Sequence, residues 1–127
     1  MRRLTLLLIL VFAFSGYSHV SHTQDAPKPR VWTVADSKAY ARDRLYQWQE
    51  HQFACLNKLW TRESNWRSNA FNKVKVMGKH AGGIPQLLGM SPLTPPTRQI
   101  DRGLDYIIHR YGTPCMAWKF HEKNGYY

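Results

Sequence analysis

The chain has 127 residues and a formal net charge of +10, because 18 Lys and Arg residues stand against 8 Asp and Glu residues. This length accommodates one small domain and excludes a chain of several domains. If a protein this basic is exported, it meets anionic surfaces such as cell-wall polymers, lipid headgroups or extracellular nucleic acid, and charge alone does not choose among them.

The first 18 residues have the layout of a secretory signal peptide. Arg2 and Arg3 precede an apolar run over residues 4–14, and a short segment of small and polar residues ends at Ser18, after which we expect cleavage. The run is too short to span a bilayer comfortably, although an uncleaved membrane anchor is the alternative interpretation. We therefore expect a secreted protein of the periplasm, cell wall or extracellular space, in contact with a membrane only through this segment.

Residues 19–45 are expected to form a linker or a partly helical arm. The first part is polar and contains Pro27 and Pro29, which is typical of a flexible linker. Residues 36–45 are rich in good helix formers and predict a short leading helix. The compact domain is then expected over residues 46–127.

The first helix of that domain is predicted over residues 50–63, where Phe53, Leu56 and Trp60 recur at helical spacing. Residues 64–81 show no clear period and predict a loop, in which a small hairpin around residues 74–76 is an option. Residues 82–86 predict a turn, and the prolines within residues 92–96 predict a second break.

The clearest helix of the sequence is predicted over residues 100–111, which carry a continuous apolar stripe. Thr97 is the expected N-cap, and Gly112 with Pro114 is expected to end the helix. A last short helix carries Cys115, Trp118 and His121. The fold class expected from this order is mainly α, an α+β domain in which an irregular loop or short hairpin forms one wall of a cleft.

Cys55 and Cys115 form an even pair in a protein that we expect to be exported, so a disulfide between them is the default. It would close a loop of about 60 residues and contribute roughly 4 kcal/mol in the chain-entropy model. Two separate buried thiols are the alternative.

Glu63 is the candidate catalytic residue. It follows Trp60 by three positions and therefore extends the buried face of its helix, where loss of hydration raises the pKa of a carboxyl group. A carboxylic acid that stays neutral near pH 7 is what a general acid requires. The alternative is an exposed glutamate at the end of a helix, paired with Arg62 or Arg67.

The remaining acidic residues of the domain do not supply an obvious second carboxylate. Asp101 and Asp105 lie off the apolar stripe of their helix, Glu50 begins a helix, and Glu122 lies among lysines near the end of the chain. A glycosidase that uses two carboxylates therefore lacks its second member. One acid is still sufficient if the nucleophile belongs to the substrate.

Five short motifs resemble, in combination, the lytic transglycosylase-like domains of the lysozyme superfamily, and the resemblance covers residues 48–127. The motifs are formed by Cys55, Leu56, Leu59, Trp60, Arg62, Glu63, Ser64 and Trp66; by Ala70 and Asn72; by Gly83, Ile84, Pro85 and Gln86; by Gln99, Gly103, Leu104, Tyr106 and Ile107; and by Arg110, Tyr111, Gly112, Pro114, Cys115, Ala117 and Trp118.

This resemblance implies cleavage of the bond between N-acetylmuramic acid and N-acetylglucosamine in peptidoglycan. Glu63 would protonate the glycosidic oxygen and then accept the proton of the muramyl C6 hydroxyl, which leaves a 1,6-anhydro end. The residues implied to bind the glycan are Ser64, Asn72, Gly83, Ile84, Gln86 and Tyr106, and the cysteine pair matches a disulfide of similar domains. A core role for Tyr106 is an equal alternative.

The resemblance implies no cofactor and no metal, a monomeric protein, and peptidoglycan strands as the partner, with no nucleic acid. His80, His109 and His121 lack the spacing of metal ligands and are expected to be surface or cleft-rim residues. Residues 73–82 depart from the family pattern, because they are basic and longer than the expected turn. Hydrolysis of the same bond and a non-catalytic wall-binding module are the alternatives.

Overall fold

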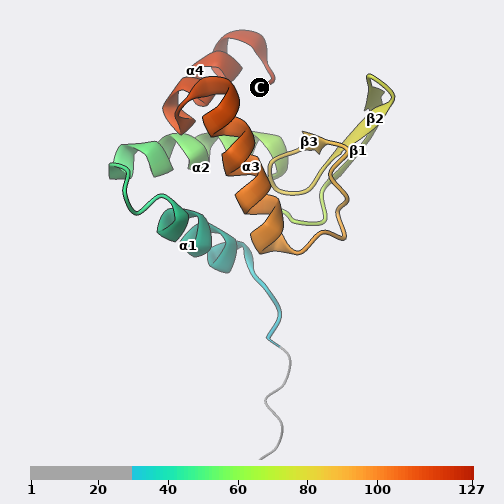
Figure 1. Cartoon of the computed structure of the whole chain (residues 1–127). Coiled ribbons are helices and arrows are strands. Elements are labelled where there is room, and N and C mark those ends of the chain that lie inside the picture. Colours follow the sequence, from blue (N-terminus) through green and yellow to red (C-terminus); the bar gives the residue numbers. More distant parts are fainter. Residues whose placement is uncertain (1–29) are drawn as a thin grey trace, which may run out of the picture. The chain divides into compact units, whose positions relative to one another are not determined.

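The computed structural model describes residues 30–127, so the predicted signal peptide and residues 19–29 lie outside the described part. Within it the chain forms helices α1 to α4 and strands β1 to β3 (Figure 1). This arrangement is a small mixed α+β domain, as expected. No helix among these residues is long and apolar enough to cross a bilayer.

Helix α1 spans Val34–Arg44 and begins with a capping box, in which the side chain of Thr33 accepts from the N–H of Asp36 and the Asp36 side chain accepts from the N–H of Thr33. The leading helix predicted from the sequence is therefore present. Its buried residues Ser37 and Ala41 are small, and α1 packs against α3 within a compact unit that spans Val31–Tyr127. The sequence had favoured a domain start near Tyr46, after this helix.

The core is formed by α2 (Glu50–Ser64), α3 (Pro96–Tyr111) and α4 (Pro114–Asn124). Helix α2 packs against α4, and α3 packs against both α1 and α4. The apolar stripes predicted for α2 and α3 contribute to one core cluster, with the following fully buried side chains: Leu56, Leu59, Trp60, Ile100 and Ile107. Burial of these stripes is the main source of stability for such helices.

The predicted N-cap of α3 was wrong. The helix begins at Pro96, with Pro95 as the N-cap residue, rather than after Thr97. Proline is well suited to the first helical turn, because its fixed φ matches the helix and the N–H that it lacks has no partner there. At the other end, Gly112 has a φ of 83° and terminates the helix as expected.

The segment that follows α2 is a three-stranded antiparallel sheet rather than a loop. Strand β1 (Phe71–Val76) pairs with β2 (Lys79–Gly82), and β2 pairs with the short β3 (Leu87–Leu88). Met77 and Gly78 join β1 to β2 with φ values of 52° and 75°, the conformation of a tight two-residue hairpin turn. The hairpin was only an option in the sequence, and it extends further than residues 74–76.

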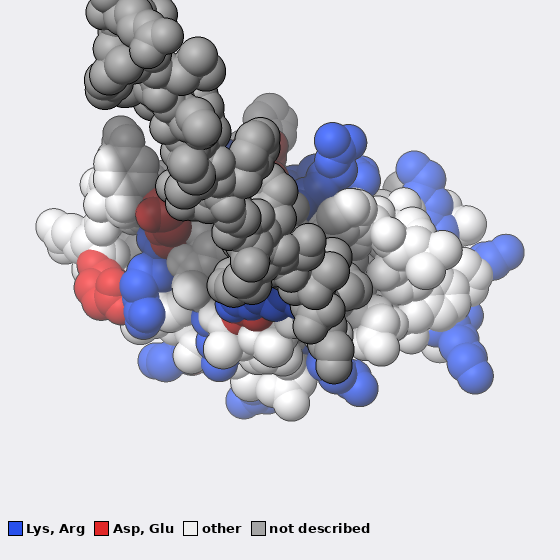
Figure 2. Space-filling model, turned by 90° about the horizontal axis from the view of Figure 1, so that it is seen from below, with Lys and Arg blue, Asp and Glu red and all other residues white. Residues whose placement is uncertain are grey.

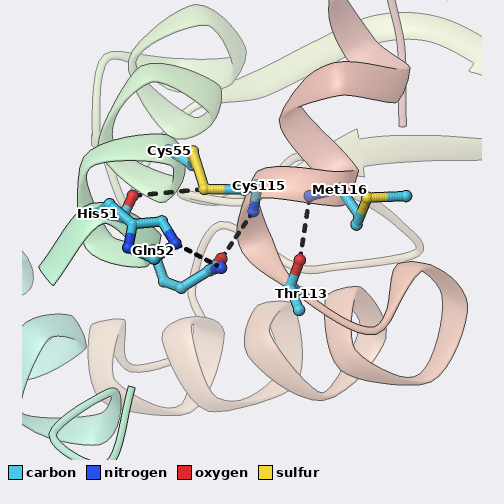
Figure 3. The surroundings of a disulfide bond; sticks show 6 residues. All are labelled: His51, Gln52, Cys55, Thr113, Cys115 and Met116. Carbon is cyan, nitrogen blue, oxygen red and sulfur yellow. Dashed lines mark hydrogen bonds between the residues drawn. A yellow bond between two sulfur atoms is a disulfide. The ribbon is translucent and has the colours of Figure 1, made fainter. Parts of the chain in front are cut away.

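The predicted disulfide between Cys55 and Cys115 is present and joins α2 to α4 (Figure 3). The two Cα atoms lie 4.9 Å apart. Beside the bond, the Gln52 side chain accepts from the backbone N–H of Cys115 at 3.0 Å, and Thr113 caps α4 by accepting from the N–H of Met116 at 3.1 Å. Hydrogen bonds and the covalent bond thus hold the start of α4 against α2.

Candidate active site

Glu63 occupies the last turn of α2, one turn after the fully buried Trp60. Its side chain is only 17% exposed, and its Oε1 lies 2.9 Å from the Nε2 of His121 on α4. The exposed helix-end position considered as an alternative, with a pairing to Arg62 or Arg67, is not the arrangement that the structure has. The carboxyl group instead lies between the ends of two helices that pack together.

Burial raises the pKa of the Glu63 carboxyl from its ordinary 4.5 to about 7. The group also lies at the C-terminal end of α2, where the helix dipole is negative and opposes ionisation. The protonated and ionised forms of Glu63 are therefore both accessible near neutral pH. A carboxyl group in this state can both donate and accept a proton under ordinary conditions.

His121 is 12% exposed and stacks on the ring of Trp118 at a centroid distance of 5.6 Å. Burial lowers the pKa of His121 below its ordinary value, the charge of Arg62 acts in the same direction, and Glu122 opposes both. The shifts of Glu63 and His121 both favour uncharged forms. Burial thus favours a hydrogen bond between neutral groups over a charged pair at this contact.

The turn at residues 83–86 is held against these helices by hydrogen bonds from two sides. The buried Ser64 hydroxyl donates to the carbonyl of Ile84 at 2.6 Å, and the N–H of Ile84 donates to the side chain of Gln99 at 2.8 Å. Gln99 is itself fully buried, and its amide donates to the carbonyls of Ser68 and Thr94. Gly83 has a φ of 71°, which an L-residue adopts only with strain.

Tyr127 connects this turn to α2, one turn before Glu63. Its hydroxyl donates to the carbonyl of Pro85 at 2.6 Å and accepts from the indole N–H of Trp60 at 3.0 Å. Burial raises the pKa of the Tyr127 hydroxyl well above 10, and the nearby charge of Glu63 adds to this effect. The hydroxyl therefore stays protonated and serves as a fixed link between α2 and the turn.

Tyr127 also lines a pocket of about 450 Å³, a size that is typical of a ligand site. Gln86, Tyr106 and Tyr127 contribute to its wall, with Arg102 and Asp105 from α3. The rings of Tyr106 and Tyr127 meet edge to face at 5.7 Å. Glu63 is not among the described residues that line this pocket, and Tyr127 is the side chain shared by the pocket and the surroundings of Glu63.

The predicted site residues are thus brought together with one exception. Ser64, Gly83, Ile84 and Gln86 meet at the turn, and Tyr106 is half-buried at the pocket. Asn72, the exception, lies on the exposed strand β1, where its side chain accepts from the N–H of Val74 at 2.9 Å. No hydrogen bond among residues 30–127 joins Asn72 to Glu63 or to the turn.

Three residues of the site were not among its predicted members. Gln99 and Tyr127 had no role assigned, and His121 was expected to be a surface or cleft-rim residue rather than a partner of Glu63. A signal for His121 was available, because Cys115, Trp118 and His121 recur every three residues and share a face of their helix. Since Cys115 bonds to α2, His121 faces α2 as well. Trp66, the last residue of the first motif, is 1% exposed and belongs to the core.

Within the described residues, no group of three or more His, Cys, Asp or Glu side chains is arranged to hold a metal ion. A further pocket of about 400 Å³ lies between α1 and the start of α2 and contains none of the predicted site residues. Comparison of the chain with family models, with curated proteins and with solved structures finds no match. The function must therefore be argued from the geometry around Glu63 and from the motifs.

Proposed function

We propose that this protein is an exported, lysozyme-like enzyme that cleaves the bond between N-acetylmuramic acid and N-acetylglucosamine in peptidoglycan. Glu63 is its general acid and base, and the product is a 1,6-anhydromuramic acid end. The observation that supports the proposal most directly is the buried carboxyl of Glu63, whose pKa of about 7 suits it to both proton transfers. The motif resemblance described above supplies the substrate class.

The reaction needs one carboxyl group and no water. Protonated Glu63 donates its proton to the glycosidic oxygen while the bond from this oxygen to the muramyl C1 breaks. The muramyl C6 hydroxyl oxygen then forms a bond to C1, and its proton passes to the Glu63 carboxylate. The enzyme ends in its starting state, and a second carboxylate is not required.

His121 is suited to keep the acidic proton on the correct oxygen. If the imidazole carries its proton on Nε2, it donates to Oε1 of Glu63 at 2.9 Å and leaves Oε2 to hold the catalytic proton. The same hydrogen bond then stabilises the carboxylate that forms after protonation of the glycosidic oxygen. His121 is a positioning residue in this scheme, because it acts through Glu63.

The turn at residues 83–86 and the pocket beside it would bind the glycan strand. The side chain of Gln86 donates to the carbonyl of Gly83 at 2.9 Å, so its orientation is fixed before a ligand arrives. Tyr106 offers an aromatic ring to a sugar face. The proposal includes no cofactor, a monomeric protein and peptidoglycan as the partner.

The test is mass analysis of the fragments that the purified protein releases from peptidoglycan sacculi. The expected products carry 1,6-anhydromuramic acid ends, and Glu63→Gln is expected to abolish their release. Glu50→Gln, at the exposed start of the same helix, is the matched control and should remain active. Products with reducing ends would instead identify a lysozyme-type hydrolase, and full activity of Glu63→Gln would remove Glu63 from the mechanism.

A non-catalytic wall-binding module is the second candidate. The charge of residues 64–100 supports this function, because the segment contains five Lys and Arg residues and no Asp or Glu. A segment of this charge is suited to binding anionic wall polymers. Co-sedimentation with sacculi without release of any soluble fragment, by wild-type protein and Glu63→Gln alike, would favour this function.

A further inference from the structure

The hairpin formed by β1 and β2 is the most exposed element of the described chain. Every residue of β1 is exposed, and the apolar side chains include Val74 at 68%, Val76 at 51% and Met77 at 89%. Figure 1 shows the hairpin projecting away from the helices. Burial of apolar side chains stabilises folded proteins, so leaving these three in water gives the domain no benefit of its own.

The same hairpin is basic. Lys73, Lys75 and Lys79 are exposed on it, and none of its residues is acidic. Figure 2 shows basic side chains projecting from the end of the molecule that the sheet occupies, while the acidic side chains visible in that view lie away from this end. The hairpin tip therefore combines three lysines with three apolar side chains over residues 73–79.

The tip is also well defined in conformation. Val76 pairs with Lys79 and Lys75 pairs with His80, so the two-residue turn is closed directly by the ladder. At the base, the ring of Phe71 packs on that of His80 at a centroid distance of 4.8 Å. A hairpin built in this way presents its side chains without a large further loss of conformational entropy on binding.

We propose that the hairpin tip docks on the surface of an anionic lipid bilayer, with Met77, Val74 and Val76 entering the headgroup region and the three lysines contacting lipid phosphates. Apolar side chains flanked by lysines are the pattern of a segment that lies in the membrane interface. The contact is independent of the reaction proposed at Glu63. It differs from the expectation that only the amino-terminal segment meets a membrane.

The apolar side chains favour a bilayer over a soluble polyanion. A nucleic acid or an anionic wall polymer attracts the lysines equally well, but it offers Met77 and Val76 no apolar interior to enter. Loss of a lysine should weaken binding to either kind of partner. Loss of the Met77 side chain should weaken binding to a bilayer alone.

The test is co-sedimentation of the full chain with vesicles of phosphatidylcholine, with or without phosphatidylglycerol. Because the full chain keeps the apolar run over residues 4–14, we expect some binding to both kinds of vesicle and clearly tighter binding to the anionic ones. At about 1 kcal/mol per lysine, or about fivefold each, the triple variant Lys73→Gln/Lys75→Gln/Lys79→Gln should bind about a hundredfold more weakly. The matched control, Lys58→Gln/Lys119→Gln/Lys123→Gln, carries the same charge change on α2 and α4 and should bind within about tenfold of the wild type.

A second pair of variants tests the contribution of the apolar side chains to vesicle binding. Met77→Ser should reduce vesicle binding about tenfold, whereas Met116→Ser, at a 54% exposed position on α4, should leave it unchanged. All variants share residues 1–29, so differences between them belong to the substituted surface. These side chains are exposed, so circular dichroism should show that every variant is folded.

A localised readout uses the wild-type protein. Hydrogen peroxide oxidises exposed methionines, and peptide mass analysis reports each site separately. Saturating anionic vesicles should slow oxidation of Met77 several-fold and leave Met116 unaffected. Three results would each overturn the proposal. The first is equal oxidation of Met77 with and without vesicles, and the second is an equal loss of vesicle affinity in the two triple variants. The third is tighter binding to polyphosphate than to vesicles, unchanged in Met77→Ser, which would assign the hairpin to a soluble polyanion.

Discussion

Replacement of Glu63 by glutamine should change how the stability of the domain depends on pH. In the unfolded chain this carboxyl has its ordinary pKa of 4.5, and in the folded protein burial raises the pKa to about 7. Between these values the folded protein binds more protons than the unfolded chain. The free energy of unfolding contributed by Glu63 is therefore fully present below pH 4.5, is lost as pH rises, and is gone above about 7.

The size of this loss follows from the two values. At 1.36 kcal/mol per pH unit, the rise from 4.5 to about 7 corresponds to at most about 3 kcal/mol. The carboxyl is partly open to solvent and accepts a hydrogen bond from His121, so we expect about 1–2 kcal/mol. His121 contributes an opposite slope, because its lowered pKa means that the folded state binds fewer protons in mild acid.

The measurement is urea denaturation of the wild type and of Glu63→Gln at several pH values from about 5 to about 8. Both proteins retain His121, so the difference between their curves reports the titration of Glu63 together with its coupling to His121. The variant should gain about 1–2 kcal/mol relative to the wild type as pH rises through this range. Glu50→Gln, whose side chain is 70% exposed, is the matched control and should run parallel to the wild type. Parallel curves for Glu63→Gln as well would refute the burial of a neutral carboxyl.

Three further substitutions probe the supports of the site. Replacing Cys55 and Cys115 by alanine removes a bridge of sequence separation 60 and should lower the free energy of unfolding by about 4 kcal/mol, as measured in urea; an unchanged midpoint would contradict this. Gln99→Leu leaves one buried and two partly buried backbone groups without their partner and should lower the free energy of unfolding by about 3 kcal/mol; an unchanged value would contradict this. Gly103→Ala adds a Cβ atom 2.7 Å from the ring of Trp60 and should lower the free energy of unfolding by about 1–3 kcal/mol, as measured by thermal or urea unfolding. An unchanged stability would mean that α2 and α3 move apart at no cost.

Helical periodicity was enough to predict most of the helical core. The stripes of α2 and α3 are unbroken, so they are visible in the sequence. Helix α2 forms where expected, and α3 ends where expected but begins earlier, at Pro96. Helix α1 shows the limit of this approach, because its buried positions include Ser37 and Ala41, and a short side chain in a tight contact leaves no apolar stripe to detect. The packing of α1 on α3 is a tertiary property that composition does not reveal.

The sheet could not be predicted with the same rules. Strand β1 alternates lysine and valine, but all its residues are exposed, so the usual signal of one buried and one solvated face is missing. The hairpin turn is built from Met77 and Gly78 rather than from the common Asn-Gly pair. Residues of the site that act across long sequence distances, such as Gln99 on the turn at residues 83–86, also carry no local signal.

The disulfide and the Glu63–His121 hydrogen bond lie on the same pair of helices. Cys55 precedes Glu63 by eight residues on α2, and Cys115 precedes His121 by six residues on α4. The disulfide therefore lies about 12 Å along the axis of α2 from Glu63 and about 9 Å along the axis of α4 from His121. On each helix the cysteine comes before the residue of the Glu63–His121 contact, so α2 and α4 run side by side in the same direction. The bridge between Cys55 and Cys115 therefore helps to hold together the two helices that bring the imidazole of His121 beside the carboxyl of Glu63.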